Sequence, residues 1–198
     1  KLGITLPAAG HYGVGQMFMP QDDRLRAHCE KIWERLIREE GLEFLGWRSV
    51  PVDNSRLPQL VRAAEPVHRQ LFVGRSKGMT DQAEFERKLY LIRKVVSNAL
   101  FTSFKERDVG HYTVSLSSRT LVYVGMLISG QIERFYPDVC DPEFVSALCL
   151  VHSRYSTNTL GAWELAHPFC NHAATAEINT IQGNQNWMRA REAMLRAD

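Results

Sequence analysis

Two long stretches of the chain place apolar residues at the spacing of one helix face. In residues 22–40 they are Leu25, Cys29, Ile32, Trp33, Leu36 and Ile37, and in residues 81–98 they are Phe85, Leu89, Ile92, Val95 and Val96. Recurrence every three to four residues predicts an amphipathic helix with one buried side. Asp22 stands where an N-cap is expected, and Gly41 stands where the first helix should end.

Short apolar runs alternate with these helical patterns. We predict a short helix over residues 57–64 and strands over residues 12–19, 42–50, 67–73, 112–117 and 121–125. Two strand–helix–strand cycles of similar size indicate a ferredoxin-like pair of split β-α-β units over residues 10–117. Both long helices should then pack on one face of a sheet.

The last third of the chain has a different character. Residues 147–152 are an apolar run, which predicts a core strand over residues 147–160 that leads into a substrate loop. Residues 129–135 are expected to be helical, and residues 185–196 are expected to form a closing helix. Residues 163–186 are dense in His, Asn, Thr and Trp, and polar loops on a strand scaffold commonly carry function.

Composition narrows the class of protein. Hydrophobic residues make up 44% of the chain and charged residues 23%, with a net charge of only +2. Basic residues are scattered among acids, so we expect no nucleic-acid partner. No apolar run reaches the ~18 residues of a membrane span, and the four cysteines form no CxxC pair. We expect a location in the cytoplasm or an organelle matrix, and we interpret a chain that begins at Lys1 as a piece of a longer protein.

A cluster of His167, Cys170 and His172, with His152 earlier, has the nitrogen and sulfur ligands that zinc prefers. Its spacing matches no standard zinc finger, and a polar loop accounts for it equally, so we predict no metal. Cys170 and His172 would share one face of a strand and could form a Cys–His hydrolase pair. No third residue that would orient the histidine is evident.

Several strings in the last third are similar to one known family. The run His152–Thr159 reads HSRYSTNT and is similar to HxRxSTNT, and residues 163–169 read WELAHPF. Residues 177–188 follow the pattern E-I-N-T-x-x-G-N-x-N-W-M. Further strings that fit are Gly46-Trp47-Arg48, Ser115-Leu116-Ser117-Ser118-Arg119-Thr120 and Phe135-Tyr136-Pro137-Asp138. Across nearly its whole length, the chain resembles the class II glutamine amidotransferase domain of the glutamate synthase large subunit.

This resemblance implies an α+β fold, the four-layer αββα arrangement of N-terminal-nucleophile hydrolases. Residues 1–198 would be one amidotransferase-like domain, in which residues 118–198 form part of the core and the substrate loops. The implied reaction is hydrolysis of glutamine to glutamate and ammonia by an N-terminal cysteine, whose own α-amine, with a pKa near ~8, is the base. FMN and an iron–sulfur cluster belong to other domains of the family, so we expect no cofactor in this chain. The implied partners are glutamine or glutamate and the remaining domains or subunits of a glutamate synthase.

The resemblance also implies roles for individual residues. Arg154 would grip the α-carboxylate of glutamine, for which a bidentate guanidinium is well suited. The alternative is that Arg154 braces a loop through backbone carbonyls. Ser156 and Thr157 either help to cradle the substrate or cap the turn.

Two departures from the family pattern affect the chemistry. No cysteine stands at the N-terminus, and the oxyanion pair Asn-Gly is replaced by Thr175 and Ala176. Alanine cannot follow a glycine at positive φ without strain, and one lost oxyanion donor typically costs about 10²–10³ in rate. We therefore expect this chain, as given, to lack glutaminase activity. The alternative is a non-catalytic relative that keeps the fold for binding or assembly.

Overall fold

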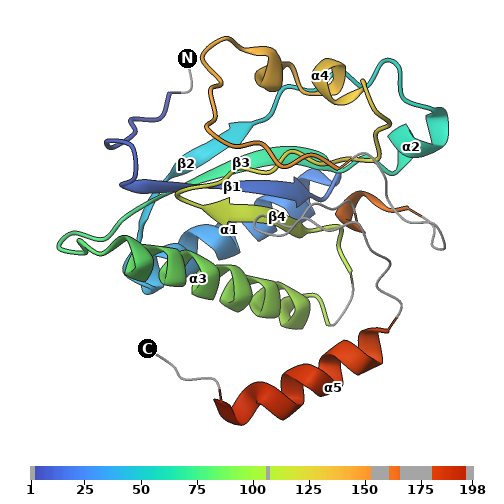
Figure 1. Ribbon diagram of the computed structural model, residues 1–198. Helices are drawn as coiled ribbons and strands as arrows, with labels where there is room; N and C mark the ends of the chain where they lie inside the picture. Colours follow the sequence, from blue (N-terminus) through green and yellow to red (C-terminus); the bar gives the residue numbers. More distant parts are fainter. Residues whose placement is uncertain (1–2, 106–107, 153–160, 166–179, 195–198) are drawn as a thin grey trace.

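A four-stranded antiparallel sheet lies at the centre of the computed structural model, which describes residues 3–105, 108–152, 161–165 and 180–194. Its strands, in the order β2-β3-β1-β4, are β1 (Tyr12–Met19), β2 (Glu43–Ser49), β3 (Val67–Gly74) and β4 (Tyr112–Ser117). β3 thus separates β1 from β2, and β1 separates β3 from β4 (Figure 1). This is the order of two interlocked split β-α-β units. The α+β class is confirmed, whereas the four-layer arrangement stays a prediction.

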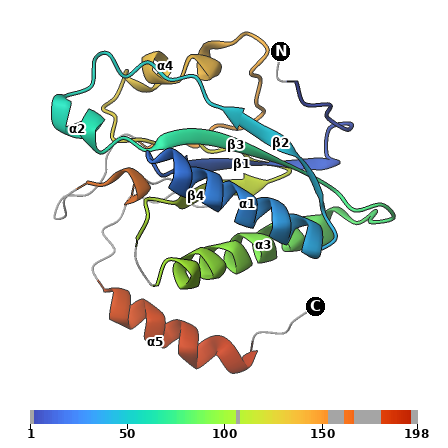
Figure 2. The ribbon, with the colours of Figure 1, turned by 180° about the vertical axis from the view of Figure 1, so that it is seen from behind.

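Two long helices, α1 (Asp23–Glu39) and α3 (Gln82–Ser103), cover one face of this sheet, as predicted (Figures 1 and 2). Alternate residues of the strands point toward the helices and bury their side chains there. The resulting core consists of Met17, Met19, Cys29, Ile32, Trp33, Leu36, Ile37, Leu42, Leu71, Val73, Phe85, Leu89, Ile92, Val96, Leu100 and Leu116. It contains most of the apolar positions that the helical spacing singled out.

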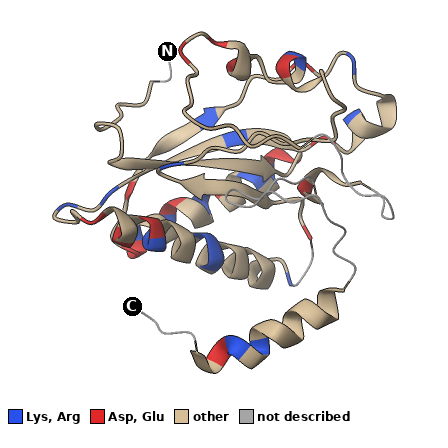
Figure 3. Cartoon of the chain, in the orientation of Figure 1, with Lys and Arg blue, Asp and Glu red and all other residues tan. Residues whose placement is uncertain are grey.

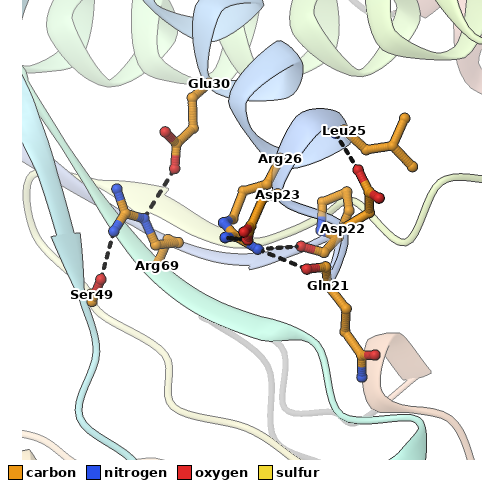
Figure 4. A network of polar contacts seen from close by, with 9 residues as sticks. Gln21, Asp22, Asp23, Leu25, Arg26, Glu30, Ser49 and Arg69 are labelled. Atoms are coloured by element: carbon orange, nitrogen blue, oxygen red, sulfur yellow. Dashed lines mark hydrogen bonds and ion pairs between the residues drawn. The ribbon is translucent and has the colours of Figure 1, made fainter.

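α1 is held by its N-cap, by the glycine after its C-terminal end and by an ion pair to the sheet. The side chain of Asp22 accepts a hydrogen bond from the backbone N–H of Leu25 (2.8 Å), which confirms the predicted cap. Gly41, at φ +75°, ends the helix in a conformation that glycine adopts without strain. Arg69 of β3 forms an ion pair with Glu30 of α1 (3.1 Å) and so ties the helix to the sheet (Figure 4).

The other face of the sheet is covered by residues 118–152, which we call the cross-sheet segment. It contains the helix α4 (Ile132–Phe135) and the 3₁₀ turn η1 (Pro137–Cys140). The short helix α2 (Gln59–Ala63) and the 3₁₀ turn η2 (Trp163–Leu165) lie beside it. A second core of Phe18, Val50, Leu57, Val122, Val124, Phe135, Tyr136 and Trp163 fills this side. The sheet is therefore covered on both faces, and its inner strands β1 and β3 are mostly buried.

The strand predicted over residues 121–125 is wrong. Val122 and Val124 are buried, but their backbone groups bond to side chains instead of a neighbouring strand. The N–H of Val122 donates to Ser115 Oγ (3.3 Å), and the carbonyl of Val124 accepts from the hydroxyl of Tyr136 (2.8 Å). The apolar pattern therefore predicted the burial of these residues correctly. Their backbone groups form hydrogen bonds with side chains and not with another strand.

The core strand predicted from residue 147 onward is also wrong in its described part, residues 147–152. Leu148 is 75% exposed and Val151 is 82% exposed, and neither belongs to a strand. A strand needs a neighbour that supplies ladder hydrogen bonds, and within the described residues no strand pairs with this run. Residues 153–160 lie outside the described residues.

The closing helix exists, but it begins earlier than predicted. α5 (Ile181–Arg191) is followed by the 3₁₀ turn η3 (Glu192–Met194). Its N-cap is Thr180, whose hydroxyl oxygen accepts from the backbone N–H of Gly183 (2.9 Å). The polar run before Trp187 concealed this start, because it lacks the apolar spacing that marks a helix.

Charges of both signs are interspersed over α1 and α3 (Figure 3). The i, i+4 pair Arg35–Glu39 on α1 is one example (2.9 Å). Within the described ranges, no helix is both long enough and apolar enough to span a membrane.

Candidate functional site

The residues to which the family resemblance assigns the chemistry lie outside the described residues. They are Arg154, Ser156, Thr157, Thr175 and Ala176, so their roles stay predictions. Cys170 and His172, the alternative Cys–His pair, lie outside the described residues as well. The structure does describe the residues that flank Arg154, Ser156 and Thr157. His152 lies at one end, exposed, and Trp163 lies at the other end, 3% exposed.

Trp163 is held in a group of aromatic rings that we call the aromatic hub: Phe18, His68, Phe135, Tyr136 and Trp163. Its ring centroid lies 5.4 Å from that of His68 and 5.6 Å from that of Phe135. The indole N–H donates to the backbone carbonyl of Val61 (3.3 Å). The first residue of the WELAHPF string is therefore fixed against the sheet by packing and by one hydrogen bond.

His68 is buried in the middle of this hub, and its neighbours define its tautomer. The hydroxyl of Tyr136 donates to the carbonyl of Val124, so it accepts from Nδ1 of His68 (3.0 Å). The lone pair of Nε2 then faces Oε1 of Glu65 at 3.8 Å. Asn54 donates to the other carboxylate oxygen of Glu65 (2.8 Å). Burial lowers the pKa of His68 to about 4 and raises the pKa of Glu65, so both shifts disfavour charge on this pair.

The burial of His68 predicts a loss of stability in mild acid. In the unfolded chain His68 binds a proton near pH 6.5, whereas in the folded chain it does so only near pH 4. The free energy of unfolding therefore falls as the pH drops through this interval. Glu65 offsets part of this loss, because its raised pKa lets the folded chain bind a proton more readily than the unfolded chain. We expect His68, after this offset, to contribute a loss of about 2 kcal/mol, at about 1.4 kcal/mol for each pKa unit. Urea unfolding of the wild type and of a variant without this histidine, each at pH 7 and pH 4.5, measures this contribution.

The matched variant is His68→Gln, which cannot titrate. Its stability should depend less on pH than that of the wild type over the same interval. His111 is affected in the same direction, since burial also lowers its pKa to about 4, so some dependence should persist. Equal pH dependence in the two proteins would show that His68 contributes nothing to it.

A row of polar side chains crosses the sheet on the same face as the hub. In register across the four strands are Ser115, Gln16, Gln70 and Arg48. Arg48 Nη2 donates to Oδ1 of Asp138 (2.7 Å), and Arg48 Nη1 donates to Oδ2 of Asp138 and to Oε1 of Gln70. The ion pair between Arg48 and Asp138 joins the last residue of the GWR string to the last residue of the FYPD string.

Tyr123 completes this network. Its hydroxyl accepts from Nε2 of Gln70 (3.0 Å) and donates to Oδ2 of Asp138 (2.9 Å). The hydrogen bonds from Arg48 lower the pKa of Asp138, and burial raises the pKa of Tyr123 to about 12. At neutral pH the carboxylate is therefore charged and the phenol keeps its proton, which fixes every donor in the network.

Two pockets border these features. One of about 320 Å³ lies between the end of β1, the turn before β3 and the loop before β4, with Trp163 at its edge. Its carboxylates, Glu65, Asp108 and Glu164, oppose a ligand with a free carboxylate, so we do not assign glutamine to it. The other, of about 450 Å³, carries mixed charges, including Arg56 and Arg134 beside Asp53.

Sequence reasoning missed several of these residues. Gln16 is 0% exposed and Gln70 is 3% exposed, both on the inner strands of the sheet. A polar residue amid the apolar positions of an inner strand was the signal that could have found them, because buried polar groups need partners. Among the residues that the structure describes, the amide nitrogen of Gln16 nevertheless finds no hydrogen-bond acceptor.

The remaining upstream string has a structural role. The carboxylate of Glu86 on α3 accepts from the backbone N–H of Ser118 (2.7 Å) and from the hydroxyl of Ser117 (2.9 Å). Ser117 in turn accepts from the N–H of Arg119 (3.0 Å), which closes the turn after β4. The SLSSRT string thus directs the chain away from the sheet edge and into the cross-sheet segment.

Within the part of the chain that the structure describes, no three His, Cys, Asp or Glu residues lie close enough to hold a metal ion. The candidate ligands His167, Cys170 and His172 fall outside that part. The zinc alternative therefore stays untested.

Comparison with known proteins defines the class. The family model described as "Glutamine amidotransferases class-II" matches residues 1–198, and the chain belongs to this family.

The individual proteins that the chain is similar to are glutamate synthases. The chain is 46% identical over 189 residues to the glutamate synthase [NADPH] large chain of Bacillus subtilis (strain 168), a match that covers 96% of this chain and 12% of that protein. It is 40% identical over 198 residues to the ferredoxin-dependent glutamate synthase 2, chloroplastic, of Arabidopsis thaliana, covering 100% of this chain and 12% of that protein. Against the glutamate synthase [NADPH] large chain of Azospirillum brasilense the identity is 39% over 183 residues, covering 92% and 12%. The chain thus spans about an eighth of the length of these relatives.

Proposed function

We propose that this chain is the glutamine amidotransferase domain of a glutamate synthase, which supplies ammonia for glutamate synthesis. The observation that carries this proposal is a family match over the whole chain, together with relatives whose names are glutamate synthases. Its partners would be glutamine and the other domains or subunits of the synthase, which would hold the FMN and the iron–sulfur cluster. The cytoplasm or an organelle matrix suits this function. The central sheet, covered on both faces, would be one of the two sheets of an αββα arrangement.

Within this domain, Arg154 would bind the α-carboxylate of glutamine, with Ser156 and Thr157 beside it. Support comes from the HSRYSTNT string that contains these residues and from the chemistry of a guanidinium, which pairs with a carboxylate through two parallel hydrogen bonds. The fixed position of Trp163 gives this part of the chain a rigid attachment a few residues further on.

Calorimetry with glutamine and with glutamate tests this assignment. Arg154→Ala should weaken binding at least tenfold, because a charge-assisted hydrogen bond contributes roughly 1.5–3 kcal/mol. The matched variant Arg154→Lys keeps the charge but loses the fork, so its affinity should fall between the other two. Equal affinities in the wild type and Arg154→Ala would refute the role of Arg154.

A polypeptide that begins at Lys1 is expected to release ammonia from glutamine no faster than background. Attack requires a nucleophile, a base and oxyanion donors together, whereas binding alone lowers no chemical barrier. Thr175 and Ala176 replace the family's Asn-Gly pair, and no N-terminal cysteine is present in this polypeptide. Ammonia release is followed beside a Cys170→Ser variant. Release that disappears in the variant would show that Cys170 acts as the nucleophile.

The second candidate is a non-catalytic relative that retains the fold for binding or assembly. The replacement of Asn-Gly by Thr175 and Ala176 favours it. The two candidates separate when the chain is extended to the length of its relatives, including any segment before Lys1. Glutamine hydrolysis by that longer protein supports the amidotransferase, and binding without hydrolysis supports the relative.

A further inference from the structure

We propose that the amphipathic helix α5 packs, within its own chain, onto residues 144–151 of the cross-sheet segment, which we call the outer apolar stretch. In the structure α5 lies away from this stretch, on the far side of α3 (Figures 1 and 2). The inference concerns how the chain covers its own exposed apolar surface, and it does not depend on the proposed function.

α5 has an apolar side that nothing buries. At about 100° per residue, its large apolar residues fall on one side of the helix and most of its polar residues on the other. Trp187 is 71% exposed and Ile181 is 75% exposed, and no residue of α5 is buried. The apolar side carries Ile181, Trp187 and Met188, and the polar side carries Gln182, Gln185, Asn186 and Arg189. A helix of this length is marginal in water by itself, so α5 requires a surface on which to pack.

The outer apolar stretch is a surface of the matching kind. Val145 is 88% exposed, and the large apolar side chains of the stretch are Phe144, Val145, Leu148, Leu150 and Val151. One end of the stretch is fixed to the body of the protein, because Phe144 packs on Tyr123 at 5.8 Å. Contiguous exposed apolar surface of this kind commonly marks a place of contact.

Charge selects this stretch over the outer side of α3, which also exposes apolar residues. Asp141 and Glu143, both exposed, stand directly before the stretch, whereas Arg191 projects from the apolar side of α5. On α3, Lys94 lies over the ring of the exposed Tyr90 (5.8 Å), so a positive charge already occupies that surface. The arginine of α5 is therefore attracted to the stretch and repelled by α3.

The length of the chain permits this packing. Trp163 belongs to the core between the sheet and the cross-sheet segment, so the chain that leads to α5 departs from the side on which the stretch lies. At about 3.6 Å per residue, the connection from Leu165 to Thr180 can span up to about 50 Å. The stretch is therefore within reach of α5.

Hydrogen–deuterium exchange in the full-length protein tests the packing, with peptides from α1 as the reference. Leu148→Asp places a charge in the stretch at a side chain that is 75% exposed, and it should raise the exchange of α5 about tenfold or more while α1 keeps its protection. The matched control Leu91→Asp makes the same change on the outer side of α3 and should leave α5 unchanged. Arg191→Glu should also raise the exchange of α5, and Arg189→Glu, on the polar side, should change it less.

A cross-link identifies the surface that α5 occupies. Cys149 is exposed within the stretch, so a short bismaleimide should join it to the thiol that Met188→Cys introduces. The reaction is run on a mixture of isotope-labelled and unlabelled protein. Joined peptides should carry the same label, as contact within one chain requires.

An α5 that exchanges without protection in the wild type would overturn the proposal. Equal exchange of α5 in the wild type and in Leu148→Asp would do the same, and a rise caused by Leu91→Asp alone would assign the helix to α3 instead. Links between differently labelled peptides would assign the stretch to a second copy of the chain. Equal effects of Arg191→Glu and Arg189→Glu would contradict the side of α5 that faces the stretch.

Discussion

Replacing Asp138 with alanine is expected to lower the free energy of unfolding by about 3 kcal/mol, one of the two largest effects that the structure predicts. The substitution leaves Arg48 charged and largely buried, without its carboxylate partner, although the amide oxygen of Gln70 still accepts from it. Removing one partner of a buried ion pair typically costs about 3–5 kcal/mol, and the residual exposure of this pair places it at the lower end. Urea unfolding followed by circular dichroism measures the effect.

The double variant Arg48→Met/Asp138→Leu distinguishes an uncompensated charge from lost packing. It should recover most of the stability, because apolar residues of similar volume commonly replace a buried pair without loss. The cost of Asp138→Ala should also depend on pH. Since the folded-state pKa of Asp138 is lowered, its contribution is complete above the usual carboxyl pKa and is lost as the pH falls through the lower folded value. The difference between wild type and Asp138→Ala should therefore shrink below about pH 4. A cost that stays constant down to pH 2 would contradict the ion pair as its source.

Replacing Trp33 with alanine is expected to cost about 4 kcal/mol, since truncation of a buried tryptophan costs roughly 3–5 kcal/mol. Trp33 is 0% exposed, at the centre of the core between α1 and the sheet. Its indole N–H also donates to Nε2 of His111 (2.9 Å), so the substitution leaves that partly buried nitrogen without its donor. Thermal and urea unfolding measure the loss.

Trp33→Phe is the matched control, because it keeps most of the ring and removes the donor. It should cost about 1–2 kcal/mol, the range for one lost hydrogen bond and a small cavity. If Trp33→Ala cost less than about 1 kcal/mol, the core would be able to collapse around the missing ring, in conflict with its close packing.

The local pattern of the sequence predicted the central elements well. The bounds predicted for the strands at residues 12–19 and 112–117 match β1 and β4, and the cap at Asp22 is formed as predicted. These features depend on neighbouring residues: alternation of apolar positions, helical spacing and a side chain that caps its own turn. Such local signals predict the structure well because the residues that form the pattern also form the helix, strand or cap.

The same reasoning failed for the apolar runs at residues 121–125 and 147–152. Both runs have strand-like composition, yet Val122 bonds to a serine hydroxyl and Leu148 is exposed. An apolar run reports a tendency toward burial, whereas a strand also requires a second strand beside it, and the run itself does not contain that information.

The sequence by itself determined the α+β class, the one-sided helices and the family, because periodicity and motif strings are properties of the chain order. Only the tertiary structure decided that Arg48 meets Asp138, which lies 90 residues away, and that Gln16 and Gln70 lie between them and Ser115 across the sheet. Which polar side chains meet depends on strand order and register, and these are set when the chain buries its apolar faces together. The strings GWR and FYPD can be read from the sequence, but only the fold shows that their last residues, Arg48 and Asp138, form an ion pair.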